Sequence, residues 1–368
     1  MQQVRRHIQV PIPRIVLVLA TVGLAFVAST VATAPARAAT VGKVSGTLQS
    51  VRSGTSSVSA GGLTWKVSQS FQPSQIRSFA GISCPSATTC YAAGIDGTFV
   101  TTDSGRLWTV LTPQPSGVGS YSIACPSAKT CYTGNGLTTD GGKTWSAFST
   151  GASPSGSIAC PSTTTCYRVG SYGIVVTTDS GTTWRLGAMP SGSEGYQFGI
   201  ACPSTTTCVA VGYDSSYQAD ILATTDSGAT WKLQTPPLGI LNLSAIACPS
   251  VTTCYALGSQ YEPSPGTRTE IIAATTDSGG TWTAHTLIGV YSGDGISCPS
   301  TTACYAIPTY GGSTAIIRTV DGWTSWKNEK IPPKTSRLAS IACPSITTCY
   351  AVGKDDKPLA GLILKRTG

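Results

Sequence analysis

The stretch CPSTTTCVAVGYDSSYQADILATTDSGATW, residues 202–231, contains the two local motifs on which the fold prediction rests. It begins with two cysteines six residues apart, Cys202 and Cys208, around a loop of polar and turn-forming residues. It ends on the form T-x-D-x-G-x-x-W, in which the acid is Asp226 and the aromatic residue is Trp231. The β-branched residues and glycines between the motifs favour short strands and tight turns over helices. Both motifs recur along the chain, so the fold is predicted to be a repeat.

The cysteine motif C-P-S-x-x-x-C occurs seven times and accounts for all fourteen cysteines. The pairs are Cys84/Cys90, Cys125/Cys131, Cys160/Cys166, Cys202/Cys208, Cys248/Cys254, Cys298/Cys304 and Cys343/Cys349. Successive copies start 35 to 50 residues apart, which is the length of a four-stranded propeller blade. Strands paired across so short a loop can bring two cysteines within bonding distance, and even numbers at fixed spacing favour disulfides in exported proteins. We therefore expect seven local disulfides with a structural role, because two thiolates per loop are too few for a metal site.

The second motif alternates with the first. Five near-complete copies are centred on Asp103, Asp140, Asp179, Asp226 and Asp277. A sixth, around Asp321, has Trp323 where glycine is expected, and a seventh survives only as residues 62–65 with Ala60 in the acid position. The acid can accept hydrogen bonds from N–H groups of its own turn, the glycine permits a positive φ, and the tryptophan is expected to pack beside the neighbouring blade. One carboxylate per turn supplies too few oxygens for a calcium loop.

These turns resemble the Asp-box, or bacterial neuraminidase (BNR) repeat, and from about residue 58 the chain is similar to Asp-box β-propellers of the sialidase superfamily. The T-T-D-x-G-x-T-W form resembles most the propellers of photosystem II assembly and stability factors. The repeats and this resemblance predict an all-β, seven-bladed β-propeller of four-stranded antiparallel blades with one disulfide hairpin per blade. Asp-boxes occur in enzymes and non-enzymes, so the resemblance implies no activity. The Cys-Pro-Ser hairpins depart from the assembly-factor pattern, so a photosystem role is not implied.

The two ends of the chain predict an export signal and a closed ring. Residues 1–38 combine a positively charged start, an apolar core and an A-x-A pattern, which predicts a signal peptide cleaved after Ala38 and a secreted protein. An uncleaved anchor is the alternative, disfavoured because the apolar core is short. Residues 39–57 are a Ser/Gly/Thr-rich lead, and residues 58–368 form the propeller. Residues 62–68 are expected to supply the fourth strand missing after residues 359–367, so that no sheet edge stays free.

The distribution of charged and apolar residues limits the classes of binding partner to be expected. The formal net charge of +8 falls to about +4 without the signal, and the remaining Lys and Arg are scattered. Nucleic acid is therefore not an expected partner. A second hydrophobic span is missing from the sequence, so no membrane partner is expected after cleavage. We expect a monomer without cofactor or metal that binds a protein or carbohydrate.

Loop length predicts where that partner binds. Up-and-down strand order places the cysteine loops and the Asp turns on one face, and the connections between second and third strands on the other. Those connections are longest in blades four to six, and functional residues concentrate on long loops. In sialidases of similar fold the active site lies away from the Asp boxes. Candidate ligand-binding residues are Tyr213, Asp214, Asp220, Tyr261, Glu262, Arg268, Glu270 and Tyr310, with Glu194, Tyr196, Tyr217, Tyr291 and Asp294 nearby. The alternative is a set of solvated loop tips without a ligand.

Three functions stay open on the sequence alone. A non-catalytic exported propeller that binds a protein or glycan is favoured, because no complete catalytic set is recognisable. A secreted glycoside hydrolase or sialidase-like enzyme would need two acids facing one pocket, such as Asp220 and Glu270. The sialidase F/Y-R-I-P segment has only an incomplete counterpart at residues 167–170, and His285 is the one histidine after the signal. A cell-wall or glycan-binding lectin is the third possibility.

Overall fold

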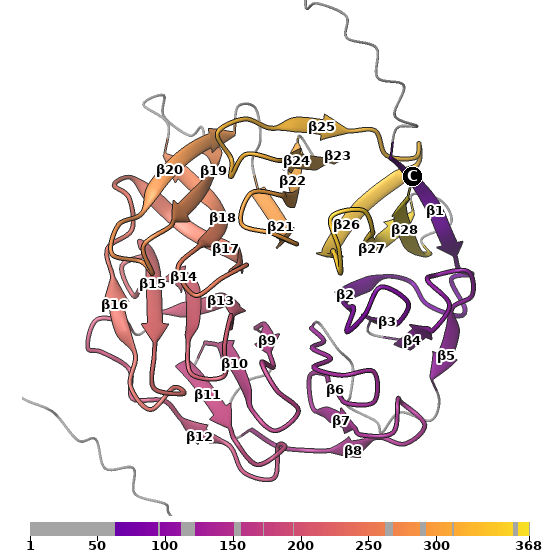
Figure 1. Ribbon diagram of the computed structural model, residues 1–368, viewed down its shortest axis with the longest axis horizontal. Helices are drawn as coiled ribbons and strands as arrows, with labels where there is room; N and C mark the ends of the chain where they lie inside the picture. The colour runs from indigo at the N-terminus through magenta and orange to yellow at the C-terminus, as the bar shows by residue number, and fades with distance from the viewer. Residues whose placement is uncertain are drawn as a thin grey trace, which may run out of the picture. The chain divides into compact units, whose positions relative to one another are not determined.

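The computed structural model describes residues 63–94, 96–111, 122–150, 156–171, 173–193, 195–261, 268–287, 292–310, 313–355 and 360–367. The regular structure in these ranges is β-strand, and the strands form seven antiparallel sheets. The sheets stand as blades around a central opening, with one edge strand of each blade facing the centre and the other forming the rim (Figure 1). The expected all-β, seven-bladed propeller is therefore confirmed. The predicted signal and lead segments lie outside the described residues.

The first four blades follow the chain in order, each from its inner to its outer strand. Blade one contains β2 (Phe79–Ser83), β3 (Cys90–Gly94), β4 (Gly97–Thr101) and β5 (Thr109–Leu111). Blade two contains β6 (Cys131–Tyr132), β7 (Gly136–Thr138) and β8 (Ser146–Ala147). Blade three contains β9 (Ile158–Ala159), β10 (Cys166–Gly170), β11 (Gly173–Thr177) and β12 (Arg185–Leu186). Blade four contains β13 (Tyr196–Ala201), β14 (Cys208–Tyr213), β15 (Ala219–Thr224) and β16 (Lys232–Gln234).

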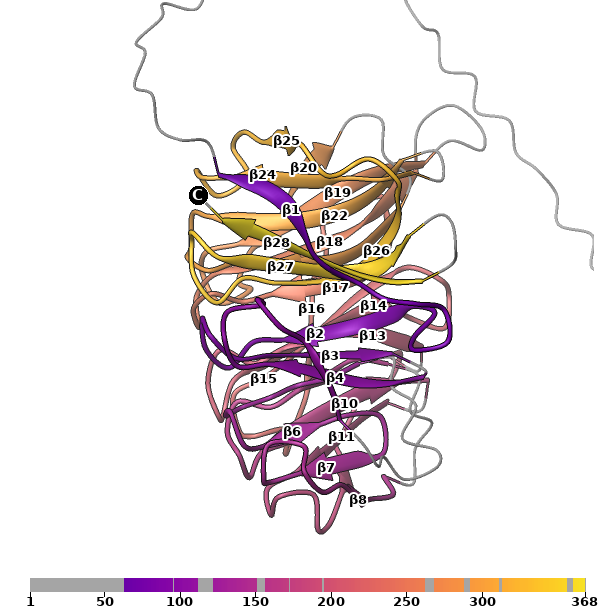
Figure 2. The ribbon, with the colours of Figure 1, turned by 90° about the vertical axis from the view of Figure 1, so that its right-hand side faces the viewer.

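The last three blades continue this order. Blade five contains β17 (Ile240–Ala247), β18 (Cys254–Tyr261), β19 (Arg268–Thr275) and β20 (Thr283–Leu287). Blade six contains β21 (Ser292–Ser297), β22 (Cys304–Tyr310), β23 (Ser313–Thr314), β24 (Ile316–Thr319) and β25 (Lys327–Glu329). Blade seven contains β26 (Thr335–Ala342), β27 (Cys349–Asp355) and β28 (Gly361–Thr367), and its outer strand is β1 (Thr64–Ser70). β1 therefore runs beside the last strand of the chain, with Thr64 paired with Thr367 (Figure 2).

Two blades depart from the four-strand pattern. In blade two the described inner segment forms only an isolated bridge, Ala124 with Tyr132, beside three short strands. In blade six the extra strand β23 pairs with β22. The inner strands of blades one, four, five, six and seven have register shifts, as at Gln197/Gly199 and Ile240/Asn242, and such bulges increase local twist.

All seven expected disulfides are present within their own hairpins, with Cα atoms 4.0 to 4.1 Å apart. In blades one to six the cysteine loop also contacts the Asp turn of its own blade, since the Ser104 N–H donates to the Thr88 carbonyl at 2.9 Å and Ser227 repeats this with Thr206 at 3.0 Å. The cysteine loops and Asp turns therefore share one face, as expected. We call this the turn face, and the opposite face, with the connections between second and third strands, the loop face.

The Asp turns are held by their own side chains. In the turn of blade four the Thr224 hydroxyl donates to Asp226 at 2.7 Å, and the Gly228 N–H donates to Thr224 at 3.0 Å. Both Ser227 and Gly228 have positive φ, of 59° and 72°, although only the glycine was expected to. The copy that looked damaged in the sequence forms the same turn, because Trp323 adopts a φ of 72° and donates its N–H to Thr319 at 3.0 Å. The turn geometry therefore survives a change at its glycine position.

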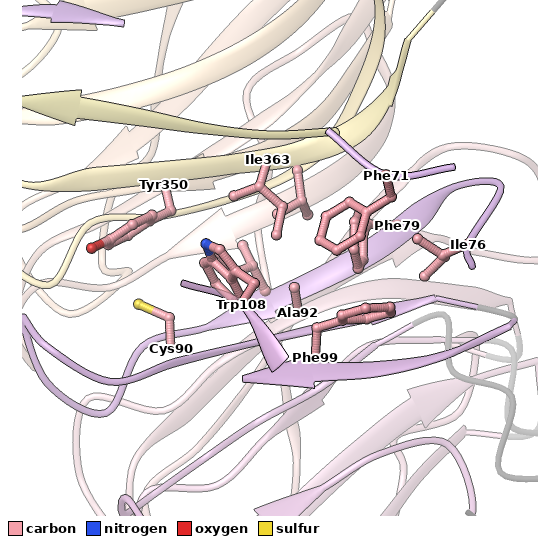
Figure 3. Close-up of a cluster of buried hydrophobic side chains, with 11 residues drawn as sticks. Phe71, Ile76, Phe79, Cys90, Ala92, Phe99, Trp108, Tyr350 and Ile363 are labelled. Atoms are coloured by element: carbon pink, nitrogen blue, oxygen red, sulfur yellow. The ribbon is translucent and has the colours of Figure 1, made fainter. Parts of the chain in front are cut away.

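The hydrophobic core is divided among the junctions between blades. The cluster between blades seven and one joins Phe79 and Phe99 to Tyr350 and Ile363, and its Trp108 lies edge-on to the Tyr350 ring at 6.1 Å (Figure 3). The other motif tryptophans are likewise buried or half-buried. Each junction thus buries aromatic rings, which bring large apolar area to a fold of short strands.

Candidate functional site

A cavity of about 310 Å³ lies where the inner strands of all seven blades meet. Its wall is built mostly from Gly, Ala, Ser and Ile, because each inner strand contributes a similar short segment. Phe198 of β13 and Asp294 of β21 break this pattern. The repeat therefore lines the central channel with small and aliphatic residues, and blades four and six add an aromatic ring and a carboxylate to it.

An aromatic cluster of Tyr196, Phe198, Tyr213 and Tyr217 adjoins this channel on blade four. The ring centroids of Tyr196 and Phe198 are 4.6 Å apart, and those of Phe198 and Tyr213 are 5.5 Å apart. Tyr217 continues the row at 5.3 Å from Tyr213, with its ring nearly parallel and 71% exposed. The cluster thus extends from the channel wall to the tip of the β14–β15 connection. Exposed aromatic rings of this kind are typical contacts for peptides and sugars.

The connection between β14 and β15 holds Tyr217 in place. The Asp214 carboxylate accepts the N–H groups of Ser216 at 2.8 Å and Gln218 at 3.0 Å. The Tyr217 N–H donates to the Asp214 carbonyl at 3.0 Å, and Tyr217 has a φ of 59°. A positive φ is unfavourable for a large side chain, so the hydrogen bonds of Asp214 offset a local backbone cost. Asp214 is consequently a residue that shapes the loop.

Asp220 is buried at the start of β15, below the aromatic cluster. Its carboxylate accepts a hydrogen bond from the Gln197 side-chain N–H at 3.0 Å. Burial raises the pKa of Asp220 to about 6, and the nearby charge of Asp214 adds to the rise. Its other oxygen has no hydrogen-bond partner among the described residues. Asp220 is therefore a poor ligand contact as the structure stands.

Glu270 of β19 is fully buried, and neither carboxylate oxygen has a hydrogen-bond partner within the described ranges. Burial raises the pKa of Glu270 to about 8, with a smaller contribution from the charge of Asp294. Asp294 itself forms an ion pair with Arg337 at 2.9 Å. An unpaired buried carboxyl is costly to ionise, so Glu270 is expected to carry a proton near neutral pH.

The two acids that a glycosidase would need do not share a described cavity. The residues lining the central channel include Asp294 but neither Asp220 nor Glu270. Within the part of the chain that the structure describes, no group of three or more His, Cys, Asp or Glu could hold a metal ion. Arg168, in the segment nearest to a sialidase signature, is a buried residue of β10 that donates to the Gly134 carbonyl. Neither of the two predicted acids therefore lines the central channel.

The remaining predicted residues that the structure describes lie on blades five and six. Tyr261 ends β18 and is 63% exposed. Arg268 and Tyr310 lie at strand ends next to the same face, at the start of β19 and the end of β22. Glu262, Glu194 and Tyr291 lie outside the described residues. The structure thus brings together the blade-four residues of the prediction, pairs Tyr261 with Arg268 at the end of the β18–β19 hairpin, and places Tyr310 on blade six.

Sequence reasoning missed Phe198 and Gln197. Both lie in β13, where Gln197 points to Asp220 and Phe198 to the channel. The period-two alternation of Tyr196, Gln197 and Phe198 could have indicated that they face different sides of the sheet. Only the register shift next to Gly199 places Phe198 in the channel wall, so the sequence alone could not assign it.

The aspartates of the turn face have lowered pKa values, whereas those of Asp220 and Glu270 are raised. A hydrogen bond from the Thr230 hydroxyl, followed by one from the Thr230 N–H, lowers the pKa of Asp226 to about 2. Equivalent bonds lower the pKa of Asp140, Asp179 and Asp321 to about 2. These acids are occupied by their own turns, which supports the structural role expected of them.

Comparison with known proteins supports the fold and goes no further. No family model and no curated protein matches the chain. The solved structure "YCF48 bound to D1 peptide" is similar over 83% of this chain and 97% of that one, with a TM-score of 0.59 and 15% identity. A GH74 enzyme from Niastella koreensis has a TM-score of 0.59 and 17% identity over 76% of this chain, which spans only 52% of the enzyme. The WD40 propeller of Doa1 has a TM-score of 0.57 and 9% identity over 82% of this chain and 97% of that one.

These identities establish only the class, a seven-bladed β-propeller. The similar structures include one solved with a bound peptide and GH74 enzymes. No helix in the described residues is long and apolar enough to cross a membrane. The seven disulfides are compatible with an oxidising, extracellular environment.

Proposed function

We propose that this chain is an exported, non-catalytic Asp-box propeller that binds a protein or glycan partner on its loop face. The observation that carries the proposal is the aromatic cluster of blade four, which offers exposed rings beside the central channel. Export rests on the signal expected over residues 1–38 and is compatible with the disulfides. The similar chain solved with a peptide adds support for a protein partner.

The burial of the acids supports a binding role over a hydrolytic one. A general acid has to reach the bond that breaks, and Glu270 is fully buried while Asp220 is 1% exposed. The raised pKa of Glu270, to about 8, would otherwise suit an acid catalyst. Because substrate cannot reach this group without strand movement, we assign it no catalytic step.

The proposal is tested by binding measurements on the mature chain. A glycan array and a peptide library separate the two partner classes, and Tyr217→Ala should weaken whichever ligand binds by at least tenfold. Leu186→Ala is the matched control, because Leu186 is an equally exposed apolar residue on the outer strand β12. Absence of binding in both screens, or full binding by Tyr217→Ala, would refute the proposal. Turnover of a fluorogenic glycoside that Glu270→Gln abolishes would replace it with the hydrolase alternative.

A further inference from the structure

A repeated tyrosine packs between one blade and the next on the turn face at six of the seven junctions. Six of the seven second cysteines are followed by a tyrosine, and all six are buried: Tyr91, Tyr132, Tyr167, Tyr255, Tyr305 and Tyr350. The hydroxyl of Tyr91 donates to the Ala128 carbonyl at 2.7 Å, in the cysteine loop of the next blade. The acceptor is the third residue after the first cysteine of that loop, and the same position accepts from Tyr132, Tyr167, Tyr255 and Tyr305.

Two further features of the next blade contact the tyrosine ring. One is the motif tryptophan of the next blade, since Tyr167 lies edge-on to Trp231 with ring centroids 6.3 Å apart. The contact between Tyr350 and Trp108 repeats this arrangement (Figure 3). The other is the turn glycine, because a Cβ on Gly228 would lie 2.8 Å from the Tyr167 ring. The junction between blades three and four therefore presents a carbonyl, an indole edge and a glycine to the Tyr167 ring.

The junction between blades four and five is the exception. Val209 follows Cys208 where the other hairpins have tyrosine. The equivalent carbonyl position, indole and glycine are present as Val251, Trp282 and Gly279. A cavity of about 370 Å³ lies at this junction, and these three residues line it together with Val209. A cavity of about 150 Å³ is enough to admit a benzene ring, so this junction has room for a phenol.

Gln234 fills part of the junction and leaves the cavity beside it. Its side-chain N–H donates to the Ser278 carbonyl at 3.1 Å, and its oxygen accepts the Trp282 indole N–H at 2.9 Å. The amide thus lies over Gly279, whereas a tyrosine ring packs over the equivalent Gly105 and Gly228. Val251 is 47% exposed, so the cavity can be reached from solvent on the turn face.

We propose that this junction binds a tyrosine side chain of a partner protein. The incoming hydroxyl would donate to the Val251 carbonyl, and the ring would pack edge-on against Trp282, as Tyr167 does with Thr205 and Trp231. The site lies on the turn face and shares no residue with the aromatic cluster of blade four. It is therefore independent of the loop-face partner proposed above.

The wild-type protein provides the first test. The probes are p-cresol and the blocked peptide Gly-Gly-Tyr-Gly-Gly, with toluene and Gly-Gly-Phe-Gly-Gly as controls that lack the hydroxyl. Both phenolic probes should shift the indole NMR signal of Trp282 in a saturable way, and the controls should bind several-fold more weakly. The indole signal of Trp231 should not move, because Tyr167 fills that junction. No Trp282 shift with either phenol would overturn the proposal, and binding of p-cresol without the peptide would overturn a protein partner.

The second test fills the cavity from within. Val209→Tyr should reduce peptide binding at least tenfold, whereas Val209→Ile, which adds no ring, should bind like wild type. Peptide binding that persists in a folded Val209→Tyr variant would place the site elsewhere. If Val209→Tyr does not fold, the Trp282 measurement on the wild type decides the matter. Tyr217→Ala should leave this binding unchanged, which separates it from the loop-face site.

Discussion

Carboxyl groups on the two faces of the ring have pKa values shifted in opposite directions. On the turn face, exposed aspartates such as Asp226 accept hydrogen bonds from their own turns, which lowers the pKa to about 2. On the loop face, Asp220 and Glu270 are buried with too few donors, which raises their pKa to about 6 and about 8. An ionised carboxylate therefore stabilises the fold on the turn face and destabilises it on the loop face. Unfavourable burial of this kind is common near functional sites, which directs the search to the loop face.

Opening the ring should have the largest effect, because both faces depend on closure. Deletion of residues 58–68 removes Trp65 and leaves most of β28 unpaired. We expect loss of cooperative unfolding and rapid proteolysis. Limited proteolysis and thermal unfolding would measure this, with deletion of residues 39–57 as the control that should behave like wild type. A protease pattern unchanged by the longer deletion would contradict the closure by β1.

Glu270→Gln tests the loop face. The folded pKa of about 8 lies above the ordinary 4.5, so the wild-type free energy of unfolding should fall as pH rises from about 4.5 to about 8. The full loss is about 5 kcal/mol, since one unit of pKa shift corresponds to about 1.4 kcal/mol. The variant should lack this pH dependence in urea unfolding between pH 4 and 9. Identical pH profiles for variant and wild type would show that Glu270 titrates normally.

Asp226→Asn tests the turn face and should lower the melting temperature by a few degrees. The change weakens the bonds from Thr224 and Thr230. Because the folded pKa is about 2 and the ordinary value 3.8, the stabilisation is complete above about pH 4 and is lost as pH falls toward 2. Melting curves at pH 7 and pH 2.5 should therefore differ between variant and wild type mainly at pH 7. An equal difference at both pH values would exclude the carboxylate as the cause.

Tyr217→Ala should have the smallest effect on stability, within about 0.5 kcal/mol. Its ring is largely exposed and its backbone φ of 59° is unfavourable for any side chain. Urea unfolding would show this, beside the loss of ligand binding proposed for the same variant. A large loss of stability would mean that the aromatic cluster is a structural element of blade four.

The predictions from sequence succeeded where the interactions are local. The seven cysteine pairs and the Asp turns each form within a few residues, so spacing alone identified them. They failed in detail where a side chain depends on its neighbours. Trp323 replaces the expected glycine, which suggested that this turn does not form. The turn forms because the Trp323 N–H donates to the Thr319 hydroxyl, as the glycine N–H does in the other turns. Glu270 looked like a loop-tip ligand, but its register opposite Ser259 and Leu287 places it inside the sheet.

The sequence by itself determined the number of blades, the disulfide pairing and the shared face of the two motifs, because repetition and short loops leave few alternatives. It also contained the one hairpin in which valine replaces tyrosine, without showing what that change does. Only the tertiary structure decided that Phe198 reaches the channel, that Glu270 is buried, and that a cavity lies beside Val209. Each of these depends on strand register or on contacts between blades, which are set by packing between segments far apart in the chain.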